Sequence, residues 1–185
     1  QEINLVTVRR DESVDCHPLI REYFAMTLET ESKQTWQSAH RRLYEHLCET
    51  TNEGDQPTLE QLQPLYQAVA HGCHAGLVSE SLADVYRDRI LRGTGPGGFY
   101  SGSKLGALGS DLGAIACFFN APWSKLSLEL SKPDQAWLLN EAAFMLRALG
   151  RLGESIEPMR AGIEGAVKLE DWQNAAIYSR NLSEL

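Results

Sequence analysis

The sequence predicts a mainly helical protein in which antiparallel helix pairs follow one short β-hairpin. Three observations carry this prediction. Apolar residues recur at helical spacing along most of the chain, capping residues and glycines mark where helices begin and end, and one phrase that joins two helices occurs twice. The length of 185 residues suits one domain or a short array of repeats.

Residues 3–16 favour a small β-hairpin. Residues 5–9 follow the two-residue period of a strand, a polar run comes next, and residues 14–16 resume extended character. His17 and Pro18 then open a helix, because proline is well tolerated at the first helical position. The apolar face of this helix consists of Leu19, Ile20, Tyr23, Phe24 and Leu28.

Three further helices are expected before residue 92. One spans about 33–50, and residues 51–57 form a loop. Thr58 and Gln61 have the spacing of a capping box, so the next helix begins there and ends near Gly76. Its antiparallel partner has a buried face made of Leu82, Val85, Tyr86 and Ile90.

Segment 92–113 holds eight of the 15 glycines and is expected to be a flexible insertion whose second half leads into a helix ending near Phe119. An irregular connector is expected over 121–134. Three more helices follow, over about 133–149, 152–167 and 171–185, and Gly150 caps the first of them.

Two phrases indicate an internal repeat. Residues 74–82 and 148–156 each combine a helix end, a glycine, a short turn, Glu-Ser-aliphatic and a new helix. Gly76 and Gly150 are 74 residues apart, or two periods of 37, close to the ~34 of tetratricopeptide repeats. The predicted fold class is therefore mainly α, with antiparallel helix pairs stacked as a tetratricopeptide-like right-handed superhelix after the N-terminal β-hairpin.

The repeat alignment predicts how the helices pack. Positions where helices would nest are Leu139, Ala142, Ala143 and Leu146 in one helix and Ser155, Met159 and Gly162 in the next. The first unit fits less well, because Gly72 and Asp88 stand at its packing positions. An irregular helical bundle has the same helices and stays open as an alternative.

Residues 16–24, with the sequence Cys-His-Pro-Leu-Ile-Arg-Glu-Tyr-Phe, follow a short hairpin and resemble the end of the winged-helix domain in STAND-class signalling NTPases (NACHT and NB-ARC relatives). Residues 64–73 and 181–185 resemble phrases of the repeat arm in bacterial members. The resemblance covers most of the chain. It implies an interaction, sensor or autoinhibitory arm that docks on a protein partner or on upstream domains of the same chain, and it implies His17 as a nucleotide-sensing candidate in the intact switch.

The same resemblance divides the chain into three regions. Residues 1–50 would be the winged-helix remnant and its linking helices, 51–132 a first helical-repeat region with the glycine-rich insertion 92–113, and 133–185 the tetratricopeptide-like repeats, truncated at the C-terminus. Because no initiator methionine is present, we expect the chain to be a fragment of a larger protein.

The sequence contains only weak matches to motifs for catalysis, nucleotide binding or metal binding. The loop Gly93–Gly98 matches G-x-G-x-x-G, but it follows a helix, and Pro96 has no N–H for a phosphate. A nucleotide-binding or hydrolase domain that uses Gly93–Gly113 stays an alternative. His71 and Cys73 point in different directions on a helix, and no second pair of zinc ligands has a recognisable spacing. We therefore expect no enzyme, no metal and no cofactor.

Composition narrows the partners. A formal net charge of −8 argues against nucleic acid, so DNA binding by the N-terminal hairpin is a distant alternative. The longest apolar run, 112–119, is too short to span a bilayer. No signal peptide is apparent and the cysteines follow no framework spacing, so a cytoplasmic location is expected. Candidate contact residues for a protein partner are Tyr66, Tyr86, Trp137 and Trp172.

Overall fold

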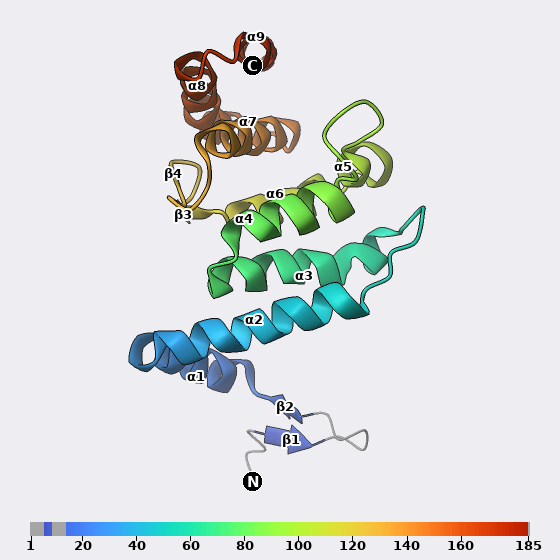
Figure 1. Ribbon diagram of the computed structural model, residues 1–185, viewed down its shortest axis with the longest axis vertical. Coiled ribbons are helices and arrows are strands. Elements are labelled where there is room, and N and C mark those ends of the chain that lie inside the picture. Colours follow the sequence, from blue (N-terminus) through green and yellow to red (C-terminus); the bar gives the residue numbers. More distant parts are fainter. Residues whose placement is uncertain (1–5, 9–13, 185) are drawn as a thin grey trace.

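A computed structural model describes residues 6–8 and 14–184 of the chain. The protein is mainly helical, as expected, and its helices stack one above another along a single long axis (Figure 1). The N-terminal end lies at one end of this axis and the C-terminal end at the other. Each helix therefore packs mainly against its neighbours in sequence, which is the arrangement that local, repeat-like packing produces.

Strands β1 (Val6–Val8) and β2 (Val14–Cys16) pair antiparallel, which confirms the predicted hairpin in its strands. The predicted turn between them lies outside the described residues. Helix α1 (Pro18–Glu31) follows, and the side chain of His17 caps it by accepting a hydrogen bond from the backbone N–H of Leu19 at 3.3 Å.

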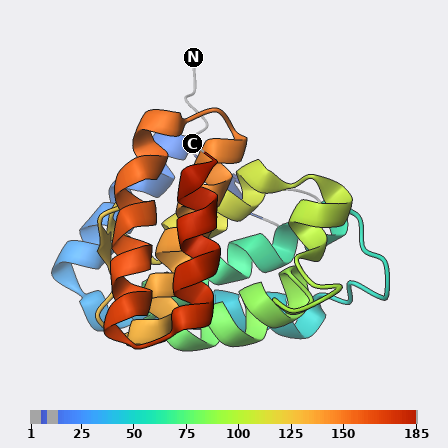
Figure 2. The same ribbon diagram turned by 90° about the horizontal axis from the view of Figure 1, so that it is seen from above.

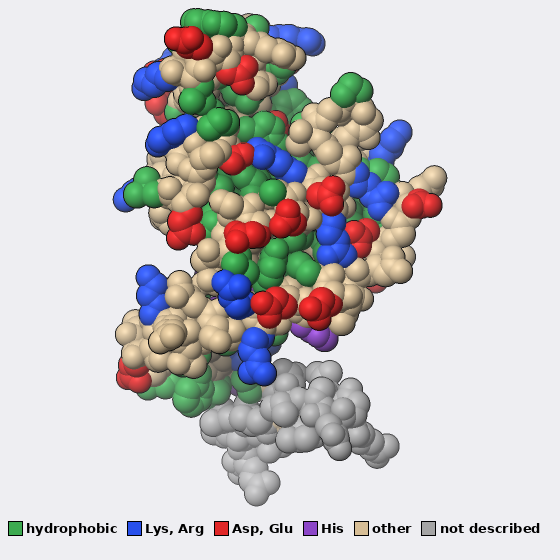
Figure 3. Space-filling view, in the orientation of Figure 1, with side chains coloured by type: hydrophobic (Ala, Val, Ile, Leu, Met, Phe, Trp, Pro, Cys, Tyr) green, Lys and Arg blue, Asp and Glu red, His purple; other side chains and the backbone are tan. Residues whose placement is uncertain are grey.

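The predicted apolar face of α1 is present but is not buried by the described residues. Leu19, Tyr23 and Phe24 are each more than 60% exposed. Hydrophobic side chains accordingly gather at the lower left of the coloured part of the molecule, where α1 lies (Figure 3). The rest of that view mixes acidic and basic side chains.

The middle of the stack is formed by α2 (Lys33–Thr50), α3 (Leu59–Ala75), the short α4 (Val78–Glu80) and the π-helical η1 (Ser81–Ile90). The capping box is confirmed, because Thr58 and Gln61 exchange side chain–backbone hydrogen bonds of 2.8 and 3.3 Å. Gly76 ends α3 with a φ of 79°, a conformation that favours glycine.

Gly72 allows the helices of this region to cross closely. A Cβ atom at this position would lie 1.9 Å from the Ser81 hydroxyl oxygen and 2.8 Å from the Tyr44 ring. The residue that fits the repeat alignment poorly is therefore the one that the packing of α2, α3 and η1 requires.

The glycine-rich segment contains more helix than expected. Its loop is followed by α5 (Tyr100–Leu105) and α6 (Leu108–Ala116), with Gly106 between them at a φ of 63°. A buried carboxylate ties the segment to the core, because Asp111 accepts hydrogen bonds from the hydroxyls of Tyr66 and Ser101 at 2.7 and 2.9 Å. The connector is not wholly irregular either: β3 (Phe119–Ala121) and β4 (Lys125–Leu126) pair antiparallel.

The C-terminal helices are α7 (Lys132–Ala148), α8 (Leu152–Lys168) and α9 (Trp172–Ser183), close to their predicted bounds. Ser155 and Met159, which the repeat alignment places at packing positions of α8, are fully buried. A Cβ atom on Gly162 would lie 3.2 Å from the backbone of both Ala136 and Asn140. Seen from above, α8 and α9 run side by side at the end of the stack (Figure 2).

One hydrophobic core runs from α3 to α7, and its largest fully buried side chains include Leu62, Leu65, Tyr86, Phe118, Leu138 and Leu146. A small separate cluster of Ala166, Ala175 and Tyr178 holds α9 against α8. Within the described residues, no helix is both long enough and apolar enough to cross a membrane.

Candidate functional site

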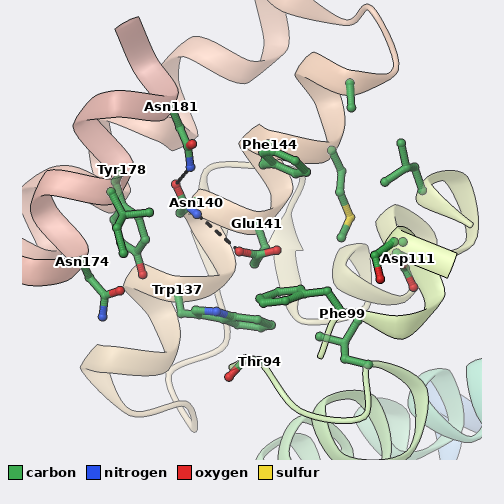
Figure 4. A pocket seen from close by; sticks show the side chains of 17 residues that line it. Thr94, Phe99, Asp111, Trp137, Asn140, Glu141, Phe144, Asn174, Tyr178 and Asn181 are labelled. Carbon is green, nitrogen blue, oxygen red and sulfur yellow. Dashed lines mark hydrogen bonds between the residues drawn. The ribbon is translucent and has the colours of Figure 1, made fainter. Parts of the chain in front are cut away.

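A pocket of about 660 Å³ opens between the glycine-rich segment and the C-terminal helices (Figure 4). One wall comes from the loop before α5, from α5 and from α6, and the other from α7 and α9. This volume is in the range of about 300–1,000 Å³ that ligand-binding pockets have. The walls belong to segments far apart in sequence, so the stacking of the helices forms the pocket.

Aromatic side chains supply much of the lining. Phe99 precedes α5, Trp137 and Phe144 lie on α7, and Tyr178 lies on α9. The orientation of Trp137 is fixed from one side by Arg87, whose guanidinium carbon lies 4.2 Å from the ring centroid. These rings offer broad apolar surfaces of low conformational entropy.

Three asparagines line the side of the pocket nearest α9. The amide nitrogen of Asn181 donates a 3.2 Å hydrogen bond to the side-chain oxygen of Asn140. Asn174 is held at the start of α9 by Asp171, which accepts hydrogen bonds from its backbone and side-chain nitrogens at 3.1 and 2.7 Å. Because a side-chain amide both donates and accepts, this group matches the hydrogen-bonding pattern of a peptide backbone.

Two carboxyl groups make the pocket acidic. Asp111 is fully buried, and burial raises its pKa, while the hydroxyls of Tyr66 and Ser101 partly offset that effect. Glu141 is 9% exposed, and burial raises its pKa to about 7. No lysine, arginine or histidine is among the residues that line the pocket.

The pocket continues into a neighbouring hollow of about 260 Å³. Both hollows are bounded by Thr94, Trp137, Asn174 and Tyr178, so they adjoin along a shared wall. Together they form a groove along Trp137, which lines both hollows. Such a groove suits an elongated ligand.

The structure separates the four aromatic residues suggested as contacts. Trp137 lines the pocket, and Trp172 is 64% exposed at the start of α9 without lining it. Tyr66 and Tyr86 are buried in the core, Tyr66 with its hydroxyl bonded to Asp111. Their burial corrects the expectation that Tyr66 and Tyr86 form a contact surface.

Three histidines that are far apart in sequence meet away from the pocket. Nδ1 of His40 and Nδ1 of His71 are 2.8 Å apart, and the rings of His40 and His74 are separated by 4.8 Å. Burial and the neighbouring imidazoles lower the pKa of His40 to about 4. Among the described residues, no group of three or more His, Cys, Asp or Glu side chains has a geometry that could hold a metal ion.

The glycine-rich loop contributes Thr94 to the pocket, and Lys104 is exposed and does not line it. A phosphate in the pocket would lie near the carboxyl groups of Asp111 and Glu141, while Arg87, which lines the adjoining hollow, is paired with Asp134. His17 caps α1 and does not line the pocket either.

Sequence reasoning missed the polar residues of the site. Asn140 and Glu141 interrupt the otherwise apolar inward face of α7, between Leu138 and Ala142. Both are buried, which is rare for glutamate without a partner. A polar pair inside a buried helical face was the available signal.

Comparisons of the chain with protein-family models, with curated protein sequences and with solved structures give no match.

Proposed function

We propose that the chain is a non-catalytic protein-interaction module whose pocket binds an extended segment of a protein partner or of upstream domains of the same chain. The observation that carries this proposal is the groove in which Asn140, Asn174 and Asn181 line one side and aromatic rings line the rest. Amides of this kind can pair with peptide groups, and the rings can bury the side chains between them.

The stacking of the helices supports the finer proposal of a tetratricopeptide-like superhelix. Gly162 allows α8 to cross α7 closely, as the repeat alignment predicts, and each helix packs against its sequence neighbours. We further propose that this stack is the sensor or autoinhibitory arm of a STAND-class signalling NTPase. That proposal depends on the phrases at 16–24, 64–73 and 181–185, and the nucleotide-sensing role of His17 depends on it in turn.

Selection from a random peptide library tests the module directly. Twelve-residue peptides displayed on phage would be selected on the purified chain, and the dissociation constants of enriched peptides measured by calorimetry. Replacing Asn181 by alanine is expected to weaken binding about tenfold, since a half-buried hydrogen-bonding amide is lost. Asn120→Ala, at an exposed position outside the pocket, is the matched control and should bind like the parent.

Two results would contradict the proposal. One is that no peptide is enriched over repeated rounds. The other is that enriched peptides bind Asn181→Ala as tightly as Asn120→Ala, because the binding surface would then lie elsewhere.

A further inference from the structure

Glu141 stands out in the pocket because its carboxylate makes no salt bridge: Arg87 acts on it only at longer range and is itself paired with Asp134 at 2.6 Å. The Glu141 side chain is 9% exposed, and the single hydrogen bond it receives comes from the Asn140 amide at a long 3.4 Å. The salt bridges of the described residues all involve other acids. A buried carboxylate without a partner is costly, so its presence at a ligand-accessible surface points to a partner supplied from outside.

We propose that this pocket takes the alkylammonium group of a lysine side chain from the bound protein segment, with the carboxylate of Glu141 as its counter-ion and the rings of Trp137, Phe99 and Phe144 around it. This inference rests on the proposed function, because the lysine belongs to the segment that the groove binds.

The aromatic surroundings fit such a group. Figure 4 shows the Glu141 carboxylate with the Trp137 and Phe99 rings on one side and the Phe144 ring on the other. Aromatic faces attract cations electrostatically, most strongly when the cation is removed from water. Arg87 shows this attraction within the chain, since its guanidinium already packs on Trp137. An ammonium next to Glu141 would combine an ion pair with contacts to these rings.

The second carboxyl group of the pocket explains why Glu141 is the receiving side chain. Asp111 accepts hydrogen bonds from Tyr66 and Ser101 and so has internal partners, but it adds to the negative potential of the pocket. The chain as a whole has a formal net charge of −8, which favours the approach of a basic segment. An anionic ligand would oppose both fields.

The protonation behaviour of Glu141 gives the inference a second readout. Burial, with a smaller contribution from Asp111 and against the opposing effects of the Asn140 hydrogen bond and of Arg87, raises the pKa of Glu141 to about 7, so the empty pocket holds a neutral carboxyl group in mildly acidic solution. An ammonium binds the ionised form. Its affinity is therefore expected to rise as the pH increases toward 7, by up to about tenfold per unit, and to level off above that value.

The probe is a blocked pentapeptide, Ala-Ala-Lys-Ala-Ala, compared with the same peptide carrying norleucine, which keeps the carbon chain and lacks the charge. Binding is followed by NMR through the indole N–H of Trp137 and the side-chain amides of Asn140 and Asn181, at pH 6 and pH 8. We expect the lysine peptide to bind at least about tenfold more tightly than the norleucine peptide at pH 8, and less so at pH 6. Glu141→Gln should remove both differences, whereas Glu157→Gln, an exposed control on α8, should keep them.

The outcomes separate the two proposals. Equal binding of the lysine and norleucine peptides at pH 8 would overturn the ammonium inference and leave the peptide groove in place. n-Butylammonium, added as a third probe under the same conditions, reports on the ammonium group alone. Its binding without binding of either peptide would overturn the peptide groove and with it a lysine from a protein segment. Binding of the lysine peptide that Glu141→Gln does not weaken would also overturn the role of this carboxylate.

Discussion

Replacing Glu141 by glutamine should stabilise the free protein at neutral and alkaline pH. The substitution keeps the shape of the side chain and its ability to accept a hydrogen bond from Asn140, and it removes a charge that the fold buries without a salt bridge. A pocket residue that lowers the stability of the free protein is expected to serve binding and not folding.

The size of the effect follows from the pKa. Burial raises the pKa of Glu141 from 4.5 to about 7. Since the folded state binds the proton more tightly, the stability that the neutral carboxyl group allows is present below pH 4.5 and is lost as the pH rises to 7. At 1.36 kcal/mol for each pKa unit, the loss at pH 8 is about 3 kcal/mol. Most of this difference develops between pH 5 and pH 8.

Urea denaturation of the parent chain and of Glu141→Gln at pH 5 and pH 8 measures this difference. The variant should gain about 2–3 kcal/mol of unfolding free energy relative to the parent between the two pH values. The exposed control Glu157→Gln should stay within about 0.5 kcal/mol of the parent at both. If the stability of the variant relative to the parent is the same at pH 5 and pH 8, the Glu141 carboxylate carries no burial cost in the folded protein.

Three further predictions concern the rest of the fold. Gly162→Ala should lower the unfolding free energy by about 1–2 kcal/mol, because its Cβ would lie 3.2 Å from backbone atoms of α7. The control Gly113→Ala, at an open helical position, should raise the unfolding free energy by up to about 1 kcal/mol. Equal melting temperatures of the two variants would contradict the close crossing of α7 and α8. The unfolding free energy should fall by about 1–2 kcal/mol as the pH falls from 6.5 to 4, because the pKa of His40 is lowered to about 4 and the unfolded chain binds the proton more tightly. Urea denaturation across this pH range should show a flatter profile for His40→Phe than for the parent. Arg89→Met should lower the unfolding free energy by about 2–4 kcal/mol, since Arg89 donates hydrogen bonds to Glu53 and to two backbone carbonyls. A decrease below about 0.5 kcal/mol in urea denaturation would show that these hydrogen bonds contribute little.

The helices could largely be predicted from the sequence, because their signals are local. The capping box at Thr58, the helix-ending glycines Gly76 and Gly150, and the small residue Gly162 at the α7–α8 crossing each depend on a few neighbouring residues. The packing of the glycine-rich segment against the core was not predictable in this way. It depends on the long-range hydrogen bond from Tyr66 to Asp111, which no local pattern encodes.

The pocket was beyond sequence reasoning for the same reason. Trp137 was a candidate contact, but its role depends on Phe99 and on the α9 asparagines, which lie far away in the chain. Tyr86, like Trp137, lies on the apolar face of a helix, but Tyr86 is fully buried. Periodicity shows which face of a helix is apolar, and only the packing shows whether that face is covered by another helix or faces a pocket.

A crystal structure of the chain bound to a selected peptide tests the central proposal most directly. We expect the peptide to lie in the groove between α5–α6 and α7–α9, with its backbone paired to Asn140 or Asn181 and a lysine ammonium at Glu141. A peptide seated on another surface, such as the exposed apolar face of α1, with the groove empty would contradict this proposal.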